Sequence, residues 1–355
     1  MDSLTKIQFD KSIEALFKSI NEGEINENLL SPGRVELTKS QLQKLVEYES
    51  NKDSSLTKVA DKQLINIYPI SEDQYSFFIS YINEAASSQS TLYYSIHLIA
   101  SQSEPNFTFS VPIDYLTRYW KTETIGNITY HFRSEINRER AKRFDAKNTM
   151  IAKKIGLQPE QLDYYMCDDY QEISKLLGFE YSIFSNGQYR DGYGVDAQTI
   201  FSVMNQEDFS HDIFHYYSGQ VNQPTDRNWI TEEGIAYLWG NAYYTDRSGN
   251  NISHERLVEE LKSYLSQNTD TDLFEFFKRN TKIFQHIAPE VSIRSTISGI
   301  IAKEVEKQKG IEGILALINA GSKDRLKSYL KQTNELLGIN EANFTVEVRR
   351  LVNAW

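Results

Sequence analysis

The segment that decides how the second half of the chain is interpreted is His211-Asp212-Ile213-Phe214-His215. It lies within residues 206–218, whose pattern of apolar and polar residues predicts a helix. Side chains four residues apart lie on the same face of a helix, about one turn from each other, so both imidazoles can converge on one ion. The spacing of His211 and His215 is therefore typical of metal ligands, although two partly buried histidines at this spacing also occur by chance.

A second segment strengthens the metal interpretation. It reads Trp229-Ile230-Thr231-Glu232-Glu233-Gly234-Ile235-Ala236-Tyr237 and predicts another helix. Together with the acid that directly follows the first histidine, the two segments resemble the gluzincins, the metallopeptidase group that contains thermolysin and the zinc aminopeptidases. Those enzymes bind zinc through His-Glu-x-x-His on one helix and a Glu on the next. Motif-level similarity is confined to these two helices.

The resemblance implies a fold, a cofactor and an activity. Zn²⁺ is expected to be bound by His211, His215 and Glu233, with Asp212 as the general base in the hydrolysis of a peptide bond. Glu232 competes with Glu233, because one residue is inserted relative to the W-x-x-E-G-x-A-x-Y line of the aminopeptidase-like members. We favour Glu233 because it brings the following Gly, Ala and Tyr into the family register.

The sequence also departs from the family. Asp212 stands where the family has Glu, and it is one methylene shorter. The Gly-x-Met-Glu-Asn loop of the aminopeptidases is absent, so exopeptidase action is unsupported. The resemblance also implies a Tyr or His beyond the third ligand that stabilises the oxyanion. The local candidates are Tyr243, Tyr244 and His254, of which we take Tyr244 as a catalytic residue.

Three functions remain open from the sequence. The first is a zinc-dependent hydrolase that acts on a peptide or protein substrate. The second is a catalytically degenerate protein of the same fold, which binds a peptide or protein partner without cleaving it; the Asp at position 212 is its main support. The third keeps two His and one carboxylate but binds iron, as in the facial triad of non-haem oxygenases. The other histidines, His97, His131, His254 and His286, are interpreted as structural, which for His254 is the alternative to a role at the oxyanion.

Composition narrows the class of partner. The 355 residues contain 38 basic and 49 acidic side chains, for a net charge of −11, and no basic run long enough to follow a phosphate backbone. Nucleic acid is therefore not an expected partner. No apolar stretch approaches the ~20 residues that a membrane span needs. The start of the chain lacks the charged and apolar regions of a signal peptide, which predicts a cytoplasmic protein, or an envelope or secreted one whose leader has been removed.

In the first half of the chain the sequence pattern predicts an α+β domain over residues 1–125. It indicates helices near 9–21 and 40–49, followed by short β-rich runs. The order of these elements fits a cone-shaped fold of the nuclear-transport-factor type. Residues 126–355 are expected to form the gluzincin-like domain, with a sheet and the active-site helix over 126–219 and the third-ligand helix and a helical tail over 220–355. A tight hairpin is predicted at Asn186-Gly187, and the site is expected between the sheet edge and the tail.

Overall fold

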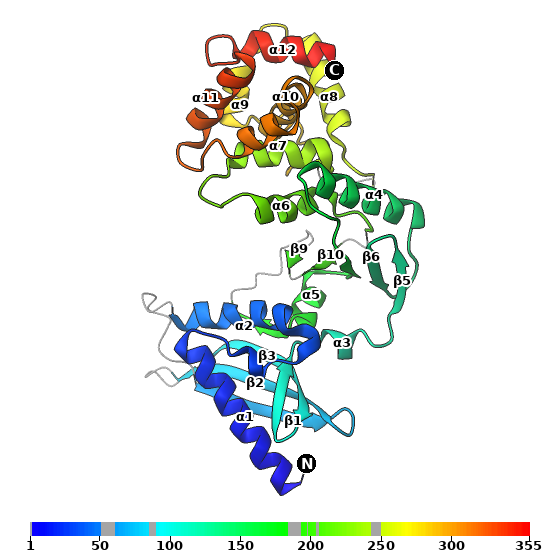
Figure 1. The fold of residues 1–355 in the computed structure, drawn as a ribbon, viewed down its shortest axis with the longest axis vertical. Helices are drawn as coiled ribbons and strands as arrows, with labels where there is room; N and C mark the ends of the chain where they lie inside the picture. Colours follow the sequence, from blue (N-terminus) through cyan, green and yellow to red (C-terminus); the bar gives the residue numbers. More distant parts are fainter. Residues whose placement is uncertain are drawn as a thin grey trace. The chain divides into compact units, whose positions relative to one another are not determined.

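The computed structural model describes residues 2–50, 61–84, 90–183, 193–196, 198–203, 206–242 and 250–355. The chain is a mixed α+β protein with an antiparallel sheet near its amino terminus and a helical carboxy-terminal region, which confirms the predicted class (Figure 1). It divides into two compact units. Unit 1 comprises Met1–Thr124, Thr129–Glu135 and Leu162–Asn205, and unit 2 comprises Ile125–Ile128, Ile136–Gln161 and Gln206–Trp355. The domain boundary at residue 125 stays a prediction, as does the cone-shaped fold.

Unit 1 contains a sheet whose strands run in the order β1-β2-β3-β4, each antiparallel to its neighbour, with β8 paired to β3. Helix α1 covers aromatic residues of this sheet: the ring of Phe9 lies 5.3 Å from that of Phe77 and 5.7 Å from that of Phe107. The helix begins where the side chain of Asp2 accepts a hydrogen bond from the backbone N–H of Thr5. The elements of this part are α1 (Ser3–Glu22), η1 (Glu27–Leu29), η2 (Pro32–Arg34), α2 (Val35–Ser50), β1 (Asp61–Pro69), β2 (Gln74–Glu84), β3 (Ser90–Ser103), β4 (Asn106–Ser110) and β8 (Phe179–Ser182).

A second sheet has the strand order β5-β6-β7-β10-β9, with β10 parallel to β7 and antiparallel to β9. The β-rich run over residues 125–132 predicts one strand, and this prediction is wrong, because two strands share the region. Gly126 adopts φ of +61°, which lets the chain turn between two short strands. The predicted hairpin at Asn186-Gly187 lies outside the described residues. The elements here are α3 (Ile113–Leu116), β5 (Lys121–Ile125), β6 (Ile128–Phe132), β7 (Leu162–Met166), α5 (Tyr170–Leu176), β9 (Tyr193–Asp196) and β10 (Thr199–Ser202).

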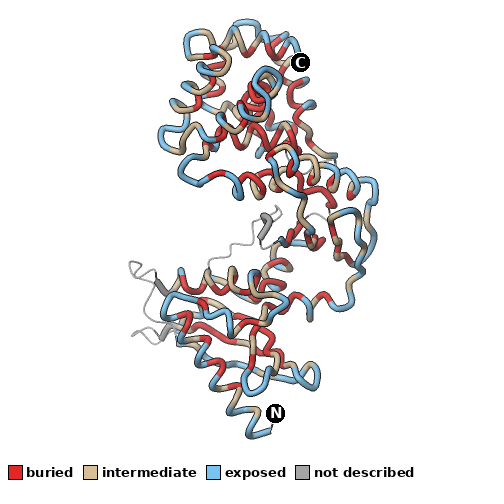
Figure 2. The backbone as a smooth tube through the Cα atoms, viewed as in Figure 1, coloured by how far each residue is buried: buried red, intermediate tan, exposed pale blue. Residues whose placement is uncertain are grey.

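Unit 2 is helical, and α10 lies at its centre, in contact with α7, α8, α9, α11 and α12. Figure 2 shows the buried residues of this unit concentrated around that helix. None of the helices in the described part of the chain is long and apolar enough to cross a membrane. The helices are α4 (Arg138–Lys154), α6 (Ser210–Val221), α7 (Trp229–Trp239), α8 (His254–Gln267), α9 (Leu273–Arg279), α10 (Ile293–Ile318), α11 (Arg325–Leu337) and α12 (Phe344–Ala354).

Candidate metal centre

The candidate centre is built on α6 and α7, and polar side chains determine where each helix begins. Helix α6 begins at Ser210, later than the predicted Gln206, because the carboxylate of Asp208 accepts the backbone N–H of Ser210. Asn205 directly precedes the predicted helix and is a residue type common at N-caps, but it lies outside the described residues. Helix α7 begins after Asn228, whose side chain accepts the N–H of Ile230 and whose own N–H donates to the carbonyl of Ile318 in α10. Both starts are thus held by contacts within unit 2.

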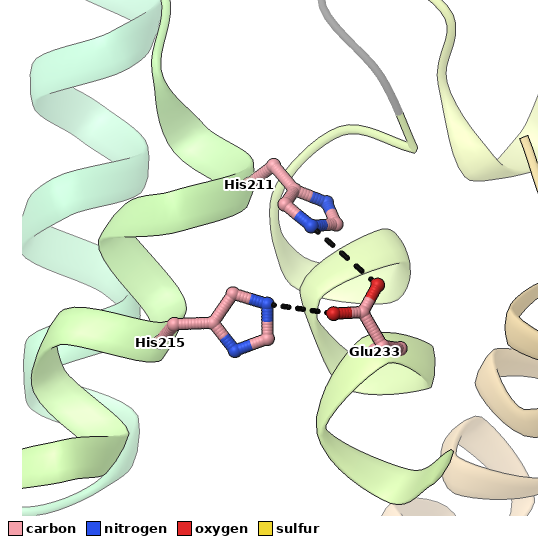
Figure 3. A group of neighbouring side chains, drawn as sticks. All are labelled: His211, His215 and Glu233. Carbon is pink, nitrogen blue, oxygen red and sulfur yellow. Dashed lines mark ion pairs between the residues drawn. The ribbon is translucent and has the colours of Figure 1, made fainter. Parts of the chain in front are cut away.

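His211, His215 and Glu233 converge, as Figure 3 shows. The Nε2 atom of His211 lies 3.7 Å from one oxygen of the Glu233 carboxylate, and the Nε2 atom of His215 lies 3.3 Å from the other. One donor atom from each residue can be chosen so that all three lie within 4.8 Å of one another. The spacing of the histidines along α6 and the packing of α6 on α7 therefore produce the predicted juxtaposition.

The tautomer of His211 is set by a second contact. Its Nδ1 lies 3.0 Å from the backbone carbonyl of Asn241 and donates a hydrogen bond to it. The lone pair of the neutral ring then resides on Nε2, the atom that faces Glu233. A histidine that is oriented in this way by a carbonyl is the usual arrangement of a metal ligand.

Glu232 lies on the opposite side of the His215 ring from Glu233. Its carboxylate is 3.8 Å from His215 Nδ1, and its side chain is fully buried. It accepts hydrogen bonds from the hydroxyl of Ser218 and the guanidinium of Arg227. The sequence indicated Glu232 only as a rival ligand of Glu233, and no pattern in it pointed to Arg227. The structure instead makes Glu232 the carboxylate behind His215, held by two partners of its own.

The electrostatics of the cluster follow from this arrangement. Burial disfavours the protonated ring of His215, but the two neighbouring carboxylates outweigh burial and raise the pKa of His215 to about 9. Burial also opposes ionisation of Glu233, yet its contact with the protonated ring of His215 prevails and lowers the pKa of its carboxyl group. In the metal-free protein a proton on His215 thus compensates the charge of Glu233, and a cation can take the place of that proton.

The donor set suits a small divalent cation. Bonds of about 2.0–2.1 Å to a tetrahedral ion place neighbouring ligand atoms roughly 3.3–3.4 Å apart, and the two nitrogen-to-oxygen separations here are 3.3 and 3.7 Å. Neither buried ring nitrogen of His215 makes a hydrogen bond of good geometry, although the carboxylate of Glu233 lies 3.3 Å from Nε2 and that of Glu232 lies 3.8 Å from Nδ1. A buried polar atom without a partner is costly, and a metal ion would satisfy Nε2 while Glu232 faces Nδ1.

Gly234 has a structural reason to follow Glu233. A Cβ atom built at this position would lie 2.5 Å from the Cβ of Ser298 in α10, a separation that real side chains do not reach. The absence of a side chain at Gly234 therefore lets α7 approach α10 closely. Trp229, on the same helix, stacks on the ring of His215 with 5.0 Å between ring centroids and 12° between planes.

The other predicted residues have different outcomes. Asp212 lies in the first turn of α6, and its negative charge contributes to the raised pKa of His215. Tyr243 and Tyr244 lie outside the described residues. The helix expected to run through Tyr244 ends at Trp239, because Gly240 leaves the helical conformation with φ of −98° and ψ of −124°.

His254 is buried in unit 2 and does not join the cluster. Its Nε2 donates a hydrogen bond to the carbonyl of Thr296 over 2.9 Å, and its ring contacts that of Trp355. Burial outweighs this hydrogen bond and lowers the pKa of His254 to about 4, so the ring is neutral at physiological pH. These contacts support a structural role for His254, as an alternative to the stabilisation of an oxyanion.

Comparison with known proteins adds no assignment to this geometry: the sequence matches no family model, and no curated protein matches it.

Proposed function

We propose that this protein is a zinc-dependent hydrolase that cleaves peptide bonds. The observation that carries the proposal is the convergence of His211, His215 and Glu233 from two packed helices, with a buried carboxylate behind one imidazole. Two His and one Glu are the ligand set of catalytic zinc sites that keep an open position. The resemblance of the two helices to the gluzincin motif supports the same interpretation.

In peptide-bond hydrolysis the residues of the cluster and their neighbours would have separate roles. Zinc, when bound, supplies a Lewis acid that polarises the peptide carbonyl and makes water more acidic. Asp212 accepts the proton of the attacking water and passes it to the leaving amine. The pair formed by Glu232 and Arg227 holds the His215 ring in its orientation, as outer carboxylates do at other zinc sites.

The length of Asp212 favours a second candidate function. Its carboxylate is one methylene short of the Glu at the corresponding gluzincin position. A base must come within about 2.6–3.2 Å of the proton that it takes. If Asp212 does not reach the attacking water, the protein binds a peptide or protein partner at the same site without cleaving it.

Elemental analysis by mass spectrometry, on protein purified without chelator, tests the metal. We expect one zinc per chain in the wild type and in His286→Ala, a control that removes an exposed histidine outside the cluster. His215→Ala should lose most of its zinc. Iron in place of zinc would favour the oxygenase alternative, and wild-type protein that stays below one zinc per chain after zinc addition would contradict the proposal.

Activity separates the two functions. Wild type and Asp212→Asn would be assayed on a fluorogenic peptide library, with zinc content measured on the same samples. The hydrolase predicts cleavage by the wild type and a loss of about 10²–10⁴-fold in the variant. Full zinc occupancy without any cleavage would replace the hydrolase by the binding protein.

A further inference from the structure

A cavity of about 600 Å³ opens beside the metal cluster, within unit 2. It shares Glu233 with the cluster, includes Trp229, which stacks on His215, and extends from there toward the end of α9, the start of α10 and the start of α11. The described residues that line it are Trp229, Ile230, Glu233, Lys278, Asn280, Ser292, Arg294, Ser295, Arg325 and Leu326. A substrate bound at a metal held by Glu233 would therefore lie beside this cavity and could extend into it.

The charge of the cavity is opposite to that of the chain. Its lining contains Lys278, Arg294 and Arg325 but, among the described residues, a single carboxylate, that of Glu233. The chain as a whole carries a net charge of −11. A bound metal would engage Glu233 and leave the three cations uncompensated within the lining. The beginning of α10 adds the positive end of a helix dipole at the same wall.

The cations differ in how far they are engaged elsewhere. Lys278 lies 3.5 Å from Glu275 on the same helix, so its charge is partly offset. Arg294 is half-buried and donates hydrogen bonds to the carbonyls of Phe277 and Lys278 at the end of α9, which fixes its guanidinium in place. Neither Arg294 nor Arg325 has an ion-pair partner in the part of the chain that the structure describes. Burial without a counter-charge lowers the pKa of Arg294, and a bound anion would relieve that penalty.

We propose that Arg294 and Arg325 bind a carboxylate of the substrate, so that the enzyme acts on peptides carrying an acidic group beside the cleaved bond. The inference rests on the proposed function, because Glu233 belongs both to the metal cluster, where the peptide bond would be cleaved, and to the lining of the cavity. Arginine presents a planar fork of donors that matches a carboxylate. The carboxylate can come from an Asp or Glu side chain or from the carboxyl terminus of the peptide.

Calorimetric titration with three pentapeptides distinguishes these sources. The first, acetyl-Ala-Ala-Glu-Ala-Ala-amide, has only a side-chain carboxylate. The second replaces Glu by Gln and is neutral, and the third is the Gln peptide with a free carboxyl terminus. The titrations use full-length Asp212→Asn protein, so that the peptides are not cleaved while they are measured. Each peptide is titrated into the zinc-loaded and into the metal-free form. We expect one of the two carboxylate peptides to bind at least about tenfold more tightly than the neutral one.

Variants of the cavity identify the groups responsible. Arg325→Gln alters an exposed side chain and should remove most of the tenfold preference. Arg294→Gln should do the same. Arg294→Lys keeps the positive charge but not the guanidinium that contacts α9, so it separates the effect of the charge from the effect of losing those contacts. Lys323→Gln removes a nearby exposed cation outside the lining and should leave the preference unchanged. Equal binding of all three peptides, or a preference that survives in Arg325→Gln and Arg294→Gln, would overturn the inference.

The same titrations separate this inference from the proposed function. Failure of the wild type to hold zinc contradicts the hydrolase, whereas the preference of metal-free protein for a carboxylate peptide still tests the cavity. Full zinc occupancy with no carboxylate preference contradicts the cavity inference and leaves the hydrolase standing. Raising the salt concentration should weaken the preferred peptide more than the neutral one, because the added contact is electrostatic.

Discussion

The adjacent acids Glu232 and Glu233 should differ sharply when each is changed to Gln. Glu232 is fully buried and bonded to both Ser218 and Arg227, so its neutralisation leaves a partly buried guanidinium, 18 % exposed, without its counter-charge. Removing one partner of a buried ion pair typically costs about 3–5 kcal/mol. The Gln amide oxygen can still accept one hydrogen bond. We therefore expect Glu232→Gln to decrease the free energy of unfolding by about 3 kcal/mol, the lower end of that range.

In a unit of this size that loss corresponds to a decrease of about 6–12 °C in the melting temperature of the metal-free protein. Zinc affinity should fall about 10–100-fold in Glu232→Gln, as is usual for a residue that orients a ligand. Glu233→Gln should show the reverse pattern, with a larger loss of zinc affinity and a smaller loss of stability, since its side chain is 23 % exposed.

Circular dichroism of metal-free protein and competition for zinc with a chelator measure the two quantities. Glu259→Gln, which changes an exposed acid on α8, serves as the control and should alter neither. If Glu233→Gln holds zinc as tightly as wild type while Glu232→Gln loses it, the third ligand lies one residue earlier, about 100° around the helix. That result would refute the assignment of Glu232 to the orienting role.

Three further changes test other parts of the structure. Asp212→Glu should raise peptidase activity if reach limits the base, measured with zinc content in parallel; activity below wild type would show that the site is adapted to the shorter acid. The pKa of His254 is about 4 in the folded protein and 6.5 in the unfolded chain. The unfolded chain therefore binds more protons between these values, and the free energy of unfolding should decrease by about 3 kcal/mol as the pH falls from 6.5 to 4. Urea unfolding across that range should show a flatter profile in His254→Gln, and an unchanged slope would exclude His254 as the cause. Gly234→Ala forces a Cβ into Ser298 and should cost about 1–3 kcal/mol and weaken zinc binding; a fully stable variant with wild-type zinc affinity would show that α7 and α10 can separate freely.

Local patterns in the sequence account for the parts of the site that depend on one helix. His211 and His215 share a face because residues four apart always do in a helix, and that relation requires no knowledge of the rest of the fold. The helix-then-strand order of the first half likewise predicted the α+β class, because the period of the apolar pattern differs between helices and strands. The metal itself and the reaction remain proposals.

Tertiary packing decided what spacing could not. Glu232 and Glu233 are adjacent and chemically identical, and only the approach of α6 to α7 directs one carboxylate to Nε2 of His215 and the other toward Nδ1 and Arg227. The end of α7 at Trp239 also escaped prediction, since the apolar pattern continues past the point where the chain turns away. The cationic cavity unites residues from α7, α9, α10 and α11. Contacts between distant segments depend on how whole helices pack, and no window of sequence contains that information.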